Sequence, residues 1–430
     1  MEDRVFAKVT WRLMPFMALL YVVAYLDRVN VSAAALTMNK DIGLTPELFG
    51  FGAGIFFLGY FLFEIPSNII LEKVGAHLWI SRIMLTWGVV SMANAFVTGP
   101  HGFYVVRFLL GLAEAGFFPG MVFYLTTWFP SAVRARLVAL FLAAVPLTNV
   151  IGTPISGLIL QMEGFHHLHG WQWLFLIEGL PSLILGLVVL KWLPKGPAEA
   201  KWLNEEERAA IADALAEEPE QHHTEMLPMF RDARVWILSG IYFGLVVAQY
   251  GINFWLPMIV REMGFTILET TFVAAAPYLV TMFAMVLWSR SSDARRERVW
   301  HIAIAALAGA AGLIGAALLH APLLVLTALT LALIGAYAAA AVFWTMPPAF
   351  LGGTAAAAGI ALINSMGNLG GFFGPNIMGW LKQETGSFTA GLGALSLGML
   401  LAAVLVVFIG RTITFAGRAA ALERYTRLNA

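Results

Sequence analysis

The chain contains no cysteine among its 430 residues, and only 12% of those residues are charged. The lack of cysteine excludes disulfides and thiolate metal sites. A soluble globular domain carries roughly 25% charged residues, about twice this share. The formal net charge is zero, which argues against nucleic acid as a partner. No Walker motif is present, so ATP is excluded as the energy source.

Apolar residues make up 60% of the chain. A soluble core of this size could not hide so much apolar surface, so lipid must be the solvent for much of it. A membrane-spanning helix needs about 20 mostly apolar residues. The sequence predicts an all-α polytopic membrane protein with twelve such spans, and the first reads as an uncleaved span because no small-residue cleavage site follows it. The predicted spans are 13–36, 48–71, 78–98, 103–127, 136–160, 172–193, 235–260, 269–289, 299–319, 323–345, 356–380 and 389–410.

The distribution of Lys and Arg predicts the orientation in the membrane. An even number of spans puts both termini on one side. The opposite loops carry only Lys40, Arg261 and Lys382, and two more basic residues, Arg28 and Arg107, lie inside spans, so 21 of the 26 lie on the side of the termini. This asymmetry places both termini in the cytoplasm. We expect a multi-pass protein of the cell membrane, in a bacterium the inner membrane.

The longest polar stretch divides the chain near its middle. It holds 4 basic and 10 acidic residues, and Asn204 followed by three glutamates predicts a capped surface helix. The two halves echo each other at an offset of 221 residues, as in Pro154 and Pro375. Two six-helix bundles joined by a linker place a binding site at the midplane between them. The expected divisions are an N-terminal bundle at 1–194, a cytoplasmic linker at 195–232, a C-terminal bundle at 233–411 and a cytoplasmic tail at 412–430.

Ionisable residues inside the spans are the most informative feature. Each costs roughly 2.5–3.5 kcal/mol at a helix centre, so each needs a partner or a purpose. The first span carries Asp27 and Arg28, and the fourth carries Arg107 and Glu114. Arg107 and Glu114 are seven residues apart and share one helix face. Glu64 lies near the cytoplasmic end of the second span, and this position predicts a structural role.

Neighbouring residues on a helix point about 100° apart, so Asp27 and Arg28 cannot face the same point. Arg28 shares its face with Tyr21, Tyr25 and Ser32, and we expect this stripe to face a central cavity with Asp27 turned sideways. The four charges sum to zero, so protonating either carboxylate makes the cluster positive and attracts an anion. Arginine suits a carboxylate because its fork pairs both oxygens. The alternative is an ion-pair network that neutralises itself and locks or gates the helices.

Uncharged polar groups elsewhere suit hydroxyls or a second carboxylate of a substrate. These candidates are Tyr60, Tyr250, Asn253, Asn364 and Asn368, and the last two lie one turn apart on one face. The alternative is hydrogen bonding between helices, which membrane proteins use widely. His166, His167 and His169 indicate a polar outer loop rather than a metal site, so no metal or cofactor is expected.

Several motifs together resemble the major facilitator superfamily, and within it the anion:cation symporter family that includes tartrate, phthalate and hexonate permeases. They are "YLDRVNVSAAA", "FLFEIPSNIILEKVGAHLWISRI", "GLAEAGFFPG", "WFPSAVRAR", "YGINFWLP" and "NLGGFFGP". The resemblance implies two rocking bundles with proton symport, in which Arg28 binds the substrate anion and Asp27 and Glu114 take up protons, with Arg107 as a supporting charge.

The resemblance also assigns a gating role to two loops, carried here by Glu72 and Lys73 and by Asp293 and Arg296. Glu72 replaces the usual aspartate and Arg296 the usual glycine. The fifth span lacks the glutamine that some sugar-acid permeases use, which argues against a galactonate-like substrate.

Three functions are compatible with these features. The favoured one is proton-coupled symport of a small organic anion, such as a sugar acid, a dicarboxylate or an aromatic acid, by a chain that is not an enzyme. Its partners are then the anion, protons and the lipid bilayer, and we expect a functional monomer. The alternatives are an exchanger or facilitator without net proton flux, and an anion sensor that does not transport. A sensor needs a signalling domain, for which the short tail after Arg411 leaves no room.

Overall fold

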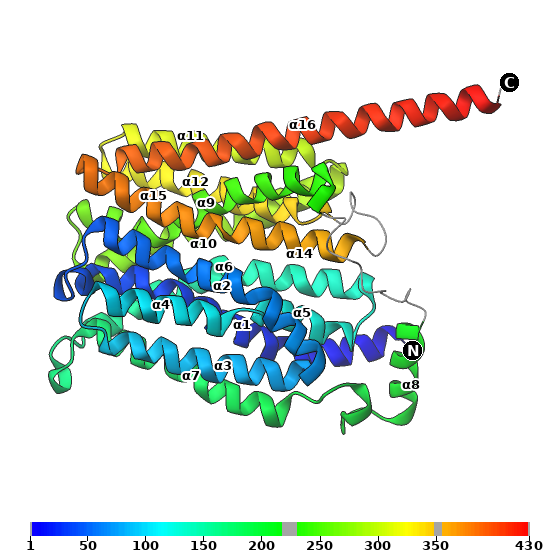
Figure 1. Cartoon of the computed structure of the whole chain (residues 1–430), viewed down its shortest axis with the longest axis horizontal. Coiled ribbons are helices and arrows are strands. Elements are labelled where there is room, and N and C mark those ends of the chain that lie inside the picture. The colour runs from blue at the N-terminus through cyan, green and yellow to red at the C-terminus, as the bar shows by residue number, and fades with distance from the viewer. Residues whose placement is uncertain (1, 217–229, 348–354, 429–430) are drawn as a thin grey trace.

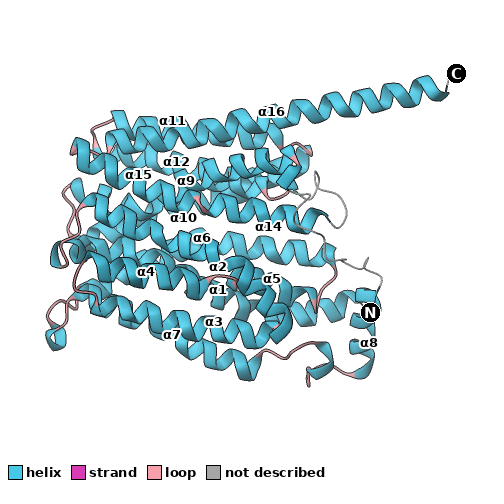
Figure 2. Ribbon diagram, in the orientation of Figure 1, coloured by secondary structure: helices cyan, strands magenta, loops and turns pink. Residues whose placement is uncertain are grey.

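The computed structural model describes residues 2–216, 230–347 and 355–428, and within these ranges it contains helices and no strand (Figure 2). The first half comprises α1 (Glu2–Asp41), α2 (Pro46–Val74), α3 (Ala76–Ala93), α4 (Pro100–Glu114), α5 (Phe117–Thr126), α6 (Ser131–Leu160) and α7 (Gly170–Trp192). Helix α8 (Glu205–Ala216) follows, and then α9 (Ala233–Glu262), α10 (Ile267–Arg295), α11 (Val299–Leu318), α12 (Pro322–Phe343), α14 (Ala355–Asn368), α15 (Gly370–Thr385) and α16 (Thr389–Leu428). Single 3-10 turns lie at Asn94–Phe96, Phe165–His167 and Pro197–Glu199.

The prediction of an all-α membrane protein is confirmed. In the described ranges, nine helical segments are long and apolar enough to cross a membrane. The predicted spans 78–98, 136–160 and 356–380 coincide with α3, with α6 and with the consecutive pair α14 and α15. Large apolar side chains such as Phe283 and Val404 point outward, 61% and 66% exposed, as expected for a surface that faces lipid.

The long helices lie side by side, and both chain ends emerge at the same end of the bundle (Figure 1). We call this the terminal end and the opposite one the distal end. Helix α8 lies at the terminal end, where Lys8 of α1 binds both carboxylate oxygens of Glu207 at 2.8 Å. The cap predicted for this helix is present, because Asn204 Oδ1 accepts from the Glu207 amide at 2.7 Å.

The fourth predicted span is broken rather than continuous. Helix α4 ends at Glu114, Gly116 adopts a left-handed conformation with φ of 86°, and α5 begins at Phe117. The break leaves the carbonyl of Ala115 free of the helix ladder, and Ser67 Oγ donates to it at 2.6 Å. Broken helices inside a membrane are tolerated where such groups are satisfied by neighbours. The break places the Glu114 side chain at a helix end in the middle of the protein.

The two halves meet closely at the distal end through pairs α2 with α15 and α6 with α10. Glycines allow this approach. A Cβ atom on Gly50 would lie 2.5 Å from the carbonyl oxygen of Pro375, and one on Gly157 would overlap Thr271. We call the α6–α10 contact the distal seam. With backbone packed against backbone, the distal end is closed.

At the terminal end, polar side chains join the halves. Glu64 of α2 accepts hydrogen bonds at 2.8 Å from both Asn364 Nδ2 and Ser365 Oγ of α14. Hydrogen bonds of this kind exchange for water more readily than packed backbone does. The structure therefore joins the halves by glycine packing at one end and by a polar contact at the other.

Replacing Gly50 with Ala should open the distal end. The added methyl group meets backbone atoms that cannot move away, and such overpacking costs about 1–3 kcal/mol, enough to change a two-state population by about fivefold or more. Since the chain has no native cysteine, spin labels on Gln161→Cys and Gln383→Cys, exposed distal positions in the two halves, report the opening as a distance.

The matched control is Gly393→Ala, because a Cβ atom there meets nothing within 4 Å. An unchanged distance distribution in Gly50→Ala would show that the α2–α15 contact does not determine closure.

Candidate functional site

Arg28 of α1 lies at the centre of the candidate site and joins the two halves. Its Nη2 forms an ion pair with Glu114 at the end of α4, and its Nη1 donates to the hydroxyl of Tyr250 on α9 at 3.1 Å. The Arg28 side chain is 16% exposed, whereas that of Glu114 is 1% exposed. The guanidinium is thus paired with a protein carboxylate but keeps a solvent-accessible edge.

Aromatic rings surround this guanidinium. Its central carbon lies 5.8 Å from the ring centre of Tyr25 and 5.4 Å from those of Phe56 and Tyr60. Cations are attracted to ring faces within about 6 Å, so the rings partly replace the lost hydration. Tyr25, which was predicted to share a helix face with Arg28, lies beside it together with the separate candidates Tyr60 and Tyr250. Their role as substrate ligands stays a prediction.

Asp27 faces away from Arg28, toward α3 and α7. Its two oxygens accept from Trp87 Nε1 at 2.9 Å, Ser91 Oγ at 3.0 Å and Ser182 Oγ at 2.7 Å. The sideways orientation predicted from helix geometry is therefore present. The groups that bind the Asp27 carboxylate are thus neutral hydrogen-bond donors and not Arg28 or Arg107.

Arg107 of α4 is completely buried, and its guanidinium lies 5.1 Å from the Phe56 ring centre. None of its three guanidinium nitrogens has a hydrogen-bond partner within the described part of the chain. The four charges that the sequence suggested as one cluster are thus separated into an Arg28–Glu114 pair, a carboxylate held by neutral donors, and a cation over an aromatic ring.

Asn253 of α9 is the centre of a buried hydroxyl cluster. Its Nδ2 donates to Tyr25 at 3.2 Å and to Tyr337 at 3.0 Å, and its Oδ1 accepts from Tyr278 at 2.8 Å. Tyr337, in the alanine-rich α12, was not identified from the sequence because no charged or polar neighbour accompanies it. The cluster adjoins Arg28 through Tyr25, which contributes to both groups.

The remaining amide candidates lie on α14, on the terminal side of α15. Asn364 binds Glu64 across the halves, and Asn368 is the last residue of α14, half-buried. Their predicted part in substrate binding stays untested. The contact with Asn364 makes Glu64 a link between the halves, which its position near one helix end did not indicate.

Glu178 of α7 is a buried acid that the sequence reasoning missed. It is 3% exposed, and its Oε1 accepts from Ser156 Oγ of α6 at 2.7 Å. The signal was available, because "LFLIEGLP" places an acid within a predicted span. Like Asp27 and Glu114, it is an ionisable acid inside a predicted span.

The predicted gating residues lie in turns at the terminal end. Glu72 and Lys73 are exposed in the last turn of α2, before Gly75 with φ of 94°. Asp293 pairs with Arg298 at 2.6 Å, and Arg296 ends α10 in the left-handed region with φ of 49°. Glycine is the usual residue in that conformation, so an arginine adopts it there at some cost in backbone strain.

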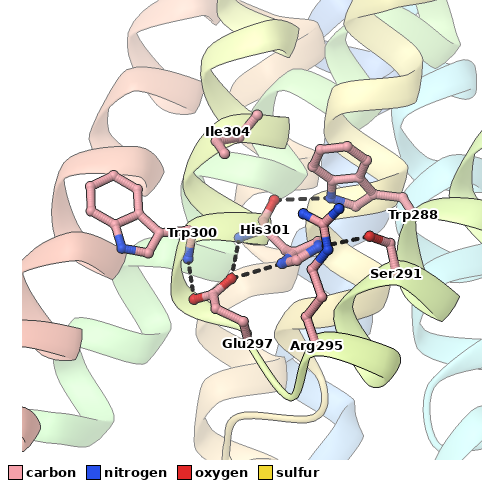
Figure 3. Close-up of a pocket in the computed structure, with 7 residues that line it drawn as sticks. All are labelled: Trp288, Ser291, Arg295, Glu297, Trp300, His301 and Ile304. Carbon is pink, nitrogen blue, oxygen red and sulfur yellow. Dashed lines mark hydrogen bonds and ion pairs between the residues drawn. The ribbon is translucent and has the colours of Figure 1, made fainter.

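A cavity of about 410 Å³ lies beside this second turn, between α10 and α11 (Figure 3). There Glu297 accepts from the amides of Trp300 and His301 at 2.7 and 3.0 Å and contacts His301 Nδ1 at 2.7 Å. These bonds cap the start of α11. The cavity is lined from one half only, by Trp288, Ser291, Arg295, Glu297, Trp300, His301 and Ile304, and is separate from the Arg28 site.

His169 in the distal loop has a structural role. Its Nδ1 lies 2.7 Å from Glu163 Oε1 and 3.5 Å from Asp41 at the end of α1. The hydrogen bond that His169 donates to the Glu163 carboxylate raises the pKa of His169, and the nearby Asp41 carboxylate adds to the effect. Among the residues described, no group of three potential ligands is placed to hold a metal ion.

Comparisons with known proteins agree with this architecture. The family model of the Major Facilitator Superfamily matches residues 17–375. Two putative tartrate transporters of Agrobacterium vitis are each 50% identical over 96% of this chain, covering 92% and 96% of their own lengths. The inner membrane transport protein RhmT of Escherichia coli is 41% identical over 96% of this chain and 95% of its own length.

Solved structures share the fold at low sequence identity. A bacterial homologue of the human lysosomal transporter Spinster, inward-facing and occupied, matches with a TM-score of 0.75 and 16% identity, over 93% of this chain and 96% of that one. A D-xylose–proton symporter matches with a TM-score of 0.73 and 14% identity, over the same shares. At these identities the likeness concerns the fold alone.

Replacing His169 with Gln should flatten the dependence of thermal stability on pH. A raised pKa means that the protonated ring stabilises the fold fully below the ordinary value of about 6.5, and that this contribution is lost as pH rises through the raised value. The ring is half exposed, so solvent screening keeps the effect below about 1 kcal/mol. Melting temperatures in detergent from about pH 5.5 to about pH 9 measure it.

His320→Gln is the control, an exposed histidine in another distal loop. Equal pH profiles for the wild type and His169→Gln would contradict the role assigned to the Glu163 contact.

Proposed function

Because the chain belongs to the Major Facilitator Superfamily, we propose that it is a secondary transporter that moves a small organic anion together with protons by alternating access. The family suggested by the sequence motifs is confirmed, and the chain is a multi-span membrane transporter rather than an enzyme. We propose the organic anion as cargo, its coupling to protons and the residues that bind each of them.

The observation that carries the proposal is the Arg28–Glu114 ion pair. A buried guanidinium needs a negative partner, and Glu114 is that partner in the structure. A carboxylate of the substrate has the same charge and geometry as the Glu114 side chain. Substrate and ionised Glu114 therefore compete for one cation, whose partly exposed edge lies between the halves.

Competition of this kind couples anion binding to proton binding. A proton on Glu114 removes its charge and frees Arg28 for the substrate, and bound substrate in turn favours the protonated acid. Such couplings amount to about 1–3 kcal/mol, or about 5–150-fold in affinity. Arg107, a second cation beside the same Phe56 ring, keeps the surroundings positive once Glu114 is neutral.

Asp27 is proposed as a further proton acceptor on the same helix. Its three hydrogen-bond donors come from α3 and α7, so any rotation of α1 that follows the movement of Arg28 disturbs them. The two neighbouring residues thereby link substrate binding on one face of α1 to proton binding on another.

The most similar relatives reported above point to tartrate as the first cargo to test, and a hydroxylated dicarboxylate fits the groups available. One carboxylate would pair with Arg28, and the hydroxyls would meet Tyr25, Tyr60, Tyr250 and Asn253. These polar groups lie around Arg28 or in the hydroxyl cluster that joins it.

We propose further that residues 1–194 and 233–411 are the two moving bundles, with the terminal end in the cytoplasm, in line with the excess of Lys and Arg there. The closed distal end then faces outward, and the Glu64–Asn364 contact, with the turns at Glu72 and Asp293, forms the cytoplasmic gate. The site lies within one chain, so a monomer in the cell membrane, in bacteria the inner membrane, suffices.

The alternative is exchange or facilitated passage of the anion without net proton flux. Purified protein in lipid vesicles distinguishes the two. Radiolabelled tartrate should accumulate when the outer solution is made more acidic than the lumen, and a proton-conducting ionophore should abolish the accumulation. Equilibration without accumulation, whatever the gradient, favours the alternative.

Replacing Arg28 with Ala should remove detectable tartrate binding, because no other accessible cation remains at the site. A charge-assisted bidentate pair at a partly buried site contributes roughly 2–3 kcal/mol, which corresponds to at least a 30-fold loss of affinity. Calorimetric titration of purified protein measures the affinity. Arg28→Lys is the matched control and should retain part of it, since lysine keeps the charge and loses the fork.

Replacing Glu114 with Gln should separate exchange from accumulation. The amide resembles the protonated acid, leaves Arg28 free and cannot release a proton. Counterflow of labelled against unlabelled tartrate should persist, whereas accumulation driven by the pH gradient should fall at least tenfold. Normal gradient-driven accumulation in this variant would place the coupled proton elsewhere.

A further inference from the structure

Among the described acids buried in the first half, Glu178 is paired with neither a cation nor a second hydrogen-bond donor. Glu114 has the Arg28 cation, and Asp27 has three hydrogen-bond donors. Glu178 has one donor, Ser156, and its Oε2 has no hydrogen-bond partner in the part of the chain that the structure describes. An ionised carboxylate is costly to bury without a cation or several donors. This geometry fits a neutral, protonated acid.

Among the described side chains of the helices that pack on α7, no cation faces Glu178. These neighbours are α3, α1, α6 and the turn Asn94–Phe96. The one charged group among their described side chains that faces it is Asp27, which is itself acidic. The ionisable residues of α3 and α6 lie in the first two turns of those helices, at the terminal end, and Arg28 points to Glu114 instead.

The amide of Asn30 lies beside the Glu178 carboxyl without meeting hydrogen-bond geometry, and both of its side-chain polar atoms are buried and unpaired among the described residues. A small shift of α1 or α7 would let this amide donate to an ionised Glu178. The structure thus places the Asn30 amide, a potential donor to the ionised form, directly beside this buried acid.

The position of Ser156 connects this acid to the distal seam. Ser156 binds Glu178, and the next residue, Gly157, packs directly against Thr271 of the other half. Ser156 and Glu178 belong to the same half, so the link to the seam runs through α6. A shift of α6 against α7 when the seam opens displaces Ser156, the donor that Glu178 has among the described residues. The protonation of Glu178 and the closure of the seam must therefore influence each other.

We propose that Glu178 is a proton-binding site whose occupancy closes the distal seam. With the proton bound, the neutral acid stays buried against Ser156 and the halves meet. When the proton leaves to water at the distal side, the carboxylate needs new donors, which the separated helices and Asn30 supply. The site concerns conformation in the absence of cargo, so it does not depend on the identity of the anion.

The test uses the full chain in lipid vesicles, without substrate, carrying spin labels on Gln161→Cys and Gln383→Cys. In the otherwise native chain, raising the pH should increase the population with the longer distal distance, by up to tenfold per pH unit for each proton released. Glu178→Gln mimics the neutral acid and keeps the Ser156 contact. This variant should stay closed at pH values at which the wild type opens, and its opening should lose the pH dependence that one released proton contributes.

Asp27→Asn and Glu114→Gln in the same labelled background are the matched comparisons, because each neutralises another buried acid. A Glu178→Gln variant that opens with pH just as the wild type does would overturn the proposal, and would leave the Arg28–Glu114 mechanism untouched. Conversely, a flattened response in Glu178→Gln supports it even where tartrate is not transported.

A second measurement guards against a variant that folds poorly. Infrared difference spectra of the wild type between acidic and alkaline buffer should contain the carbonyl band of a protonated carboxylic acid in an apolar setting. One component of that band should be missing from Glu178→Gln and present in Glu114→Gln. A spectrum in which Glu178→Gln loses no such band means that the acid does not titrate, which also overturns the proposal.

Discussion

The buried cation of Arg28 determines which groups must surround it in the rest of the site. The Arg28 guanidinium sits within the membrane-spanning part of the chain, where an uncompensated charge is expensive. Glu114 compensates it at the point where α4 breaks, and three aromatic rings and Tyr250 complete its surroundings. The break at Gly116 is what brings the Glu114 carboxyl there, so the backbone irregularity and the ion pair depend on each other.

The second half contributes neutral groups to this charged centre. The Tyr250 hydroxyl that accepts a hydrogen bond from Arg28 is neutral, and the Asn253 cluster consists of hydroxyls and an amide. Rocking of the halves therefore breaks hydrogen bonds rather than separating buried ions, which keeps the barrier between states low. Glycine packing at the distal end serves the same purpose, because the contact of Gly50 with the Pro375 backbone involves no interlocking side chains and can be broken and made again.

Helix periodicity predicted much of the arrangement within α1. The stripe of Tyr25 and Arg28 and the sideways Asp27 follow from 3.6 residues per turn. Contacts between helices were beyond that reasoning. Nothing in the spacing shows that Glu64 binds Asn364, which lies 300 residues later, or that Arg107 meets an aromatic ring rather than an acid. Glu178 was not predicted, because no arginine accompanies it within its span and its partner is a serine on another helix.

The paired state seen here bears on how an empty carrier returns. In the proposed cycle, Arg28 must be neutralised in every conformation, either by cargo or by Glu114. Once the anion has left toward the cytoplasm, the Glu114 proton must follow, because only the ionised acid can replace the cargo beside the guanidinium. In that cycle, the Arg28–Glu114 pair is the arrangement with which the carrier returns. A carrier with a neutral residue at position 114 would have to return with its arginine unpaired, and would be confined to exchanging one anion for another.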